Sequence, residues 1–183
     1  VVVPGLIEKG YSKEDAYNYS VAACWEFIVP NNYDIPNIRT LNFPMAVNNA
    51  VYNDLKNASD FDEFMCSVRK SIDDETQKLI DSVKNFVFTP STYFSLFIKD
   101  CVTDCVDYSD NKKDYRNFGF HGAGIANATD ALAAIKKTIF EDKSLTADEL
   151  INALDKNFEG FEQIRNMLLT CPKMGNNDDY ADS

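Results

Sequence analysis

Residues 117–139 carry the clearest structural signal in the chain. They read Asn-Phe-Gly-Phe-His-Gly-Ala-Gly-Ile-Ala-Asn-Ala-Thr-Asp-Ala-Leu-Ala-Ala-Ile-Lys-Lys-Thr-Ile. The second half has apolar residues at helical spacing, and its two lysines lie near the end, where they oppose the helix dipole. The glycine-rich first half is typical of a tight turn between close backbones, or of amides that face an anion. It lacks both the dinucleotide glycine pattern and the Gly-Lys-Ser/Thr of a P-loop, so we expect a turn and then a core helix.

The segments on either side predict a helix-rich chain with few strands. Polar residues with a carboxylate three positions on, as at Ser12 and Thr146, are typical helix starts. The predicted helices are 12–23, 43–55, 59–87, a buried helix at 93–102, 146–160 and 161–169. Residues 1–3 are β-branched and predict a short strand, whereas three prolines in 27–44 predict an irregular loop. The pattern fits either the helical exterior of an α/β barrel or a mostly α domain.

Composition and charge narrow the class of protein. The 183 residues are 45% hydrophobic, which is enough for one domain with a real core. The net charge of -11 repels phosphate, so we expect no nucleic-acid partner and no anionic membrane partner. The five cysteines are odd in number and irregularly spaced, which favours reduced thiols and a cytoplasmic location. The chain opens Val-Val-Val-Pro-Gly without methionine, and we interpret it as a segment of something larger.

Cys24 and Glu26 form the most chemically suggestive pair, beside the single tryptophan, Trp25. A cysteine among small apolar residues is most often core filling. The Glu26 carboxylate two residues away makes a catalytic role more favoured than it is for the cysteine alone. Burial would raise the pKa of Glu26 and make it a candidate acid or base. A thiolate nucleophile would want a histidine, and the single one is His121, which taken alone is more typical of a structural hydrogen-bonding residue.

No metal site is predicted. Cys101 and Cys105 would share one face of a helix, but a structural zinc needs two further ligands. We therefore expect two buried helix cysteines there. The acidic stretch at 176–179 lacks the spacing of an EF-hand loop and is interpreted as a solvated turn.

Residues 121–182 closely resemble the pyruvate formate-lyase-like glycyl radical enzymes. The most specific pieces are the helix Asp-Ala-Leu-Ala-Ala-Ile-Lys-Lys at 130–137 and the turn Pro-Lys-Met-Gly-Asn-Asn-Asp-Asp at 172–179. Residues 4–10 and 13–17 are similar to the helix that leads into the family's cysteine loop. The resemblance covers nearly the whole chain and is weakest over 53–115. It implies an α/β fold, with this chain a helix-rich segment of a ten-stranded barrel whose helices lie outside.

The resemblance also implies domain limits and roles. Residues 1–183 would be a single segment of the catalytic domain, with the active-site cysteine loop at 20–44 and a C-terminal helical part at 117–183. Cys24 would become a thiyl radical and Glu26 would move a proton. Trp25 and His121 would contact a small-molecule substrate. No cofactor would be bound; a protein-derived glycyl radical outside this segment, installed by a radical-SAM activating enzyme, would start the reaction. The remaining barrel with its glycine loop would complete the site, and a homodimer is compatible with this interpretation.

Departures from the family pattern indicate which branch of the family this chain resembles. Pyruvate formate-lyase has two adjacent cysteines, whereas Ala23 and Trp25 flank Cys24, which points to a dehydratase or C–X lyase and away from acyl transfer to coenzyme A. Phe27 stands where polyol branches have proline, and Asn37-Ile38 stands near their His-Asp pair, which argues against a polyol substrate. The chain contains no Arg-Val-x-Gly radical motif. The alternative is a non-catalytic scaffold or binding module with the same fold.

Overall fold

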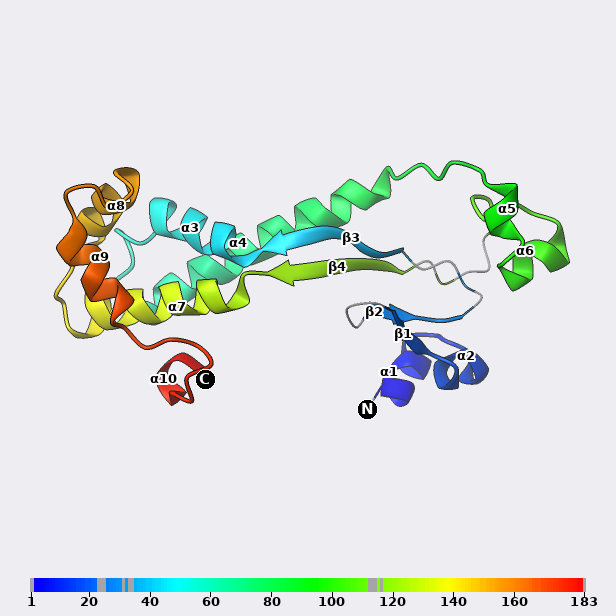
Figure 1. Cartoon of the computed structure of the whole chain (residues 1–183), viewed down its shortest axis with the longest axis horizontal. Coiled ribbons are helices and arrows are strands. Elements are labelled where there is room, and N and C mark those ends of the chain that lie inside the picture. Colours follow the sequence, from blue (N-terminus) through cyan, green and yellow to red (C-terminus); the bar gives the residue numbers. More distant parts are fainter. Residues whose placement is uncertain are drawn as a thin grey trace. The chain divides into compact units, whose positions relative to one another are not determined.

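The computed structural model describes residues 2–22, 26–30, 32, 35–111, 115 and 117–182, with only the backbone described at 26 and 35–37 (Figure 1). Helices dominate these residues, with short strands between them. The elements in order are α1 (Val2–Glu8), α2 (Lys13–Tyr17), β1 (Ser20–Ala22), β2 (Glu26–Ile28), β3 (Ile35–Asn42), α3 (Phe43–Asn53), α4 (Phe61–Lys84), α5 (Thr92–Ser95), α6 (Lys99–Asp104), β4 (Phe118–Ala123), α7 (Ile125–Ile135), the π-helix η1 (Lys136–Glu141), α8 (Ala147–Asp155), α9 (Glu162–Leu169) and α10 (Asp179–Asp182).

The chain divides into two compact units. The first consists of residues 1–40 and 81–121, and the second of residues 41–80 and 122–183. Among the described residues, no helix is both long enough and apolar enough to cross a bilayer. Within the same residues, His, Cys, Asp and Glu side chains nowhere gather in threes as a metal ion would require.

The second unit is built around α3, α4, α7 and α8. Phe64 is fully buried, and Val47, Val51 and Ile135 belong to the same apolar cluster. The helix at 43–55 is confirmed; it starts where the Asn42 side chain accepts a hydrogen bond from the Met45 amide at 3.1 Å.

Capping explains where the other helices of this unit start. The capping box of Thr146 and Glu149 is confirmed at α8, with both reciprocal bonds formed. At α4, the Glu63 amide donates to the Asp60 side chain, whereas the Ser59 hydroxyl and amide donate to the Glu63 carboxylate. The N-cap is therefore Asp60, one position after the predicted Ser59, and the predicted helix itself is present.

Gly119 and Gly122 lie in a strand, β4, and not in the turn that the sequence predicted, whereas Gly124 follows the strand as the left-handed N-cap of α7. β4 pairs with β3, and Figure 1 shows both arrows running the same way, each followed directly by a helix. A Cβ on Gly122 would lie 2.7 Å from the Phe43 ring, and one on Gly124, whose φ is +73°, would lie 2.6 Å from Pro44. The glycines allow the close approach that the sequence indicated, but to side chains of α3.

The first unit holds most of the corrections to the predicted elements. Residues 2–8 form a helix, so the strand predicted at residues 1–3 is wrong for Val2 and Val3; Pro4 lies in the first turn of this helix, where proline is tolerated. The helix starting at Ser12 ends at Tyr17 and is followed by β1, and the predicted loop at 27–44 contains β2 and β3. In the last two cases, local residue preference was outweighed by strand pairing.

The predicted buried helix at 93–102 is also wrong. Two short helices, α5 and α6, replace it, and Tyr93 and Phe97 are 75% and 62% exposed. Cys101 is buried in α6 and lies 3.5 Å from the amide nitrogen of Asn111, whereas Cys105 is exposed beyond the helix end in a left-handed conformation. The two cysteines are therefore not a buried pair.

Candidate active site

The predicted catalytic stretch is bounded by a β-hairpin. β1 and β2 pair antiparallel, with Ser20 opposite Ile28 and Ala22 opposite Glu26. Cys24 and Trp25 lie outside the described residues, and Glu26 is described in its backbone only. The roles of these three residues therefore stay predictions.

Aromatic rings support the second strand of this hairpin. The Phe27 ring contacts Tyr11 edge-on at a centroid distance of 5.9 Å and stacks on Tyr19 at 5.8 Å. Tyr11 in turn stacks on Tyr115 at 4.1 Å. Phe27 thus has a packing role, which accounts for an aromatic residue directly after Glu26 without any contact to substrate.

A hydrogen-bond network, which we call the Tyr115 latch, joins the start of α2 to the segment before β4. The Tyr115 hydroxyl donates to the Asp15 carboxylate at 2.7 Å and accepts from the Ser12 amide at 2.9 Å. The Ser12 hydroxyl donates to the same Asp15 oxygen at 2.6 Å. Tyr11 extends the network by donating to the Asn117 side chain at 2.7 Å.

The latch changes the acidity of its carboxylate. Hydrogen bonds from Ser12 and then from Tyr115 lower the pKa of Asp15, because both favour the ionised form. The ionised carboxylate holds together segments about 100 residues apart in the sequence. Through Tyr11 and Phe27, the same contacts lead to the hairpin that bounds residues 23–25.

His121 lies in β4 with a half-buried side chain. The segment that precedes it, with Tyr115 and Asn117, belongs to the latch. Because Cys24 and Trp25 lie outside the described residues, contact of His121 with a substrate beside the cysteine stays a prediction.

Sequence reasoning found one part of this support and missed the rest. The Ser12 cap with Asp15 was visible from its three-residue spacing, and the structure confirms it: the Asp15 amide donates to the Ser12 hydroxyl at 3.0 Å. The partners Tyr11 and Tyr115 carry no local signal, since they meet only in the folded chain.

Comparison with known proteins assigns the chain to a family. The family model described as pyruvate formate lyase-like matches residues 1–183. The chain belongs to this family. It is 33% identical over 208 aligned positions to isethionate sulfite-lyase from Bilophila wadsworthia, covering 98% of this chain and 25% of that protein. It is 42% identical over 94 positions to trans-4-hydroxy-L-proline dehydratase from Clostridioides difficile, covering 51% of this chain and 12% of that protein.

The solved structures of the family share the fold. The glycerol-bound form of the B12-independent glycerol dehydratase from Clostridium butyricum superposes with a TM-score of 0.76 at 24% identity, over 100% of this chain and 26% of that chain. The predicted α/β class, a helix-rich segment of a glycyl radical enzyme barrel, is thereby confirmed. The chain spans about a quarter of the length of the full-coverage relatives it matches.

Proposed function

We propose that this chain carries the thiyl-forming part of a glycyl radical enzyme that cleaves a C–X bond by dehydration, elimination or decarboxylation. Cys24 is the hydrogen-atom carrier and Glu26 the proton carrier. One observation supports this most: the strands that flank Cys24 in the sequence, β1 and β2, pair antiparallel within a chain that matches the family over residues 1–183. Paired strands on both sides of a reactive residue in the chain provide the kind of rigid scaffold on which functional residues are commonly carried.

The reaction needs two kinds of hydrogen movement. The Cys24 thiol gives up its hydrogen atom, and the sulfur then takes a hydrogen atom from a substrate carbon. The substrate radical loses its neighbouring leaving group while Glu26 transfers a proton, and the product carbon regains a hydrogen atom from the Cys24 thiol. The one-electron oxidising equivalent comes from a glycyl radical in another part of the polypeptide, installed by a radical-SAM activating enzyme. Exclusion of water protects the sulfur radical from side reactions.

The names of the relatives support the substrate class. A sulfite-lyase and a dehydratase both remove a small leaving group from a small organic molecule. We propose the same class of substrate here, met in the cytoplasm, with Trp25 and His121 contacting it. The latch and the Phe27 stack would then hold the cysteine hairpin steady against the segment that leads to His121.

The test uses the intact protein, activated without oxygen by its radical-SAM partner. Electron paramagnetic resonance should show a carbon-centred glycyl radical before substrate is added. Glu26→Gln should retain this signal and lower kcat about a hundredfold or more, which is the usual size of an acid–base contribution.

Glu14→Gln is the matched control, because Glu14 is an exposed carboxylate on the neighbouring helix α2. It should keep both the radical and kcat. Equal activity of the two variants would remove the proton-transfer role of Glu26, and absence of any radical in the activated protein would favour the non-catalytic scaffold.

A further inference from the structure

The β1–β2 hairpin is too short to be stable without support from other elements. Each strand has three residues, and among the described residues the two strands form a sheet of their own. A hairpin of two strands alone is marginally stable in water. Val21, which lies opposite Phe27 in the register, is 48% exposed and buries little surface. The backbone of Glu26 is therefore held in place by what packs against Phe27, the next residue of β2.

Two tyrosine rings hold the Phe27 ring in two different orientations. Tyr19, directly before β1, lies 5.8 Å from it with an angle of 27° between the ring planes. Tyr11, between α1 and α2, lies 5.9 Å away and nearly perpendicular, at 86°. A stacked ring and an edge-on ring together restrict both sliding and tilting of Phe27. Because Phe27 and Glu26 share a peptide bond, any shift of Phe27 displaces the backbone of Glu26 as well.

Tyr11 is itself fixed through its backbone, its ring and its hydroxyl. Its amide donates to the Leu6 carbonyl of α1 at 3.1 Å, and the next residue, Ser12, caps α2. Its ring stacks on Tyr115 at 4.1 Å, and its hydroxyl donates to the Asn117 side chain at 2.7 Å. Tyr11 therefore gives β2 a rigid surface to pack on.

We propose that Tyr11 and Tyr19 are positioning residues for proton transfer by Glu26, which they hold in place through the Phe27 ring. The inference rests on the proposed function, because it takes Glu26 as the proton carrier. Neither tyrosine takes part in the chemistry itself. A displacement of about 1 Å at a reacting group can lower a rate about a hundredfold, so a loosened Phe27 should reduce kcat even in correctly folded protein.

The test uses the intact protein, activated without oxygen. Turnover is divided by the amount of glycyl radical seen by electron paramagnetic resonance, so that unfolded or unactivated molecules are not counted. The probes are two compounds of the proposed substrate class, isethionate and trans-4-hydroxy-L-proline, and the one that wild type converts faster is used throughout.

The substitutions separate the rings from the hydroxyls. Tyr11→Leu should lower kcat per radical about tenfold or more, whereas Tyr11→Phe, which keeps the ring against Phe27, should stay within about threefold of wild type. Tyr19→Leu and Tyr19→Phe should differ in the same sense, and this pair provides a second test at a residue that is 37% exposed, where a substitution disturbs folding less. Tyr17→Leu is the matched control, because Tyr17 is 67% exposed and has no ring contact or hydrogen bond with a described residue.

A double variant distinguishes positioning of Glu26 from a purely structural role. If the tyrosines act through Glu26, adding Tyr11→Leu to Glu26→Gln should change kcat per radical by less than about twofold. A further loss as large as that in the wild-type background would overturn the proposal, and so would equal kcat per radical in Tyr11→Leu and Tyr17→Leu. In both cases a low kcat of Glu26→Gln alone would leave the proposed function standing. Wild-type kcat in Glu26→Gln alone would instead remove the proton-transfer role, and the positioning role with it.

Discussion

Removing a single oxygen, in Tyr115→Phe, tests whether the Tyr115 latch holds the cysteine hairpin. The change keeps the ring that stacks on Tyr11 and deletes only the hydroxyl. Two hydrogen bonds are lost: one to the Asp15 carboxylate at 2.7 Å and one from the Ser12 amide at 2.9 Å.

The size of the effect follows from these two bonds. A hydrogen bond to a charged group contributes about 1.5–3 kcal/mol and a neutral one about 1 kcal/mol. Water can replace the bond to the exposed Ser12 amide, and Asp15 keeps the Ser12 hydroxyl at 2.6 Å. We therefore expect a loss of about 1–2 kcal/mol in the local stability of the hairpin, which is about a 5- to 30-fold increase in its opening equilibrium.

Amide hydrogen exchange measures this opening directly. In Tyr115→Phe the amides of β1 and β2 should exchange about 5- to 30-fold faster, while those of α8, in the other unit, should not change. Tyr93→Phe is the matched control, because Tyr93 is 75% exposed and its hydroxyl has no described hydrogen bond. Unchanged exchange in β1 and β2 would refute the idea that the latch supports the hairpin.

The same experiment has a pH dependence with a defined sign. The pKa of Asp15 is lowered in the folded chain by Ser12 and Tyr115. Its stabilising contribution is therefore complete above the ordinary carboxyl pKa of about 3.9, and it is lost as the pH falls through the lowered value. The difference between wild type and Tyr115→Phe should shrink below about pH 3.9.

Three further predictions concern the scaffold. Gly122→Ala should lower the free energy of unfolding by about 1–3 kcal/mol in urea titrations, because its Cβ would lie 2.7 Å from an aromatic ring. Gly5→Ala, in a helix and with nothing within 4 Å of its Cβ, should raise the free energy of unfolding by up to about 1 kcal/mol. A shift of the same sign in both variants would contradict the packing argument. Phe64→Ala should lower the free energy of unfolding by about 3–5 kcal/mol in the same titration, since the ring is fully buried. A decrease below about 1 kcal/mol would show that the core is elsewhere. Iodoacetamide should modify Cys66 much faster than Cys171, because burial raises the pKa of the Cys171 thiol, and mass spectrometry showing equal rates would count against the structure.

Helices with strong local signals could be predicted from the sequence. The core helix after Gly124 and the capping box at Thr146 were both confirmed, because periodicity and capping are properties of neighbouring residues. The short strands could not be predicted in the same way. β1 and β2 are each three residues long, and they form only by pairing with each other, with Ala22 opposite Glu26.

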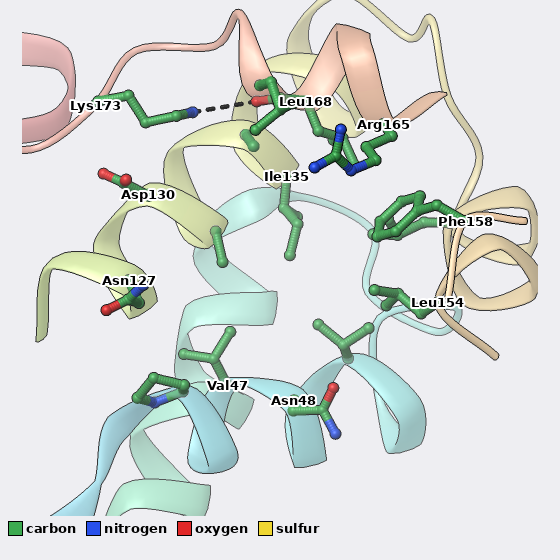
Figure 2. Close-up of a pocket in the computed structure, with 16 residues that line it drawn as sticks. Val47, Asn48, Asn127, Asp130, Ile135, Leu154, Phe158, Arg165, Leu168 and Lys173 are labelled. Carbon is green, nitrogen blue, oxygen red and sulfur yellow. Dashed lines mark hydrogen bonds between the residues drawn. The ribbon is translucent and has the colours of Figure 1, made fainter. Parts of the chain in front are cut away.

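The candidate site was predictable from family resemblance more than from physical chemistry. Locally, only the Glu26 carboxylate two residues away marks Cys24 as more than a core cysteine, and its radical role came from the matching loop. The latch depends on Tyr115 meeting Asp15, and no pattern in the sequence indicates a pair so distant. Likewise, the apolar cavity among α3, α7, α8 and α9 (Figure 2) exists only because these helices pack together, and no pattern in the sequence indicates it.

The central claim is that Cys24 carries the hydrogen atom, and one measurement tests it directly. In the anaerobically activated intact protein, the glycyl radical is quantified by electron paramagnetic resonance and turnover is measured on the same samples of wild type, Cys24→Ala and Cys66→Ala. We expect Cys24→Ala to keep the radical and lose all turnover, and Cys66→Ala, which removes an exposed thiol of α4, to keep both. Substrate turnover by Cys24→Ala at a rate near that of wild type would contradict the account.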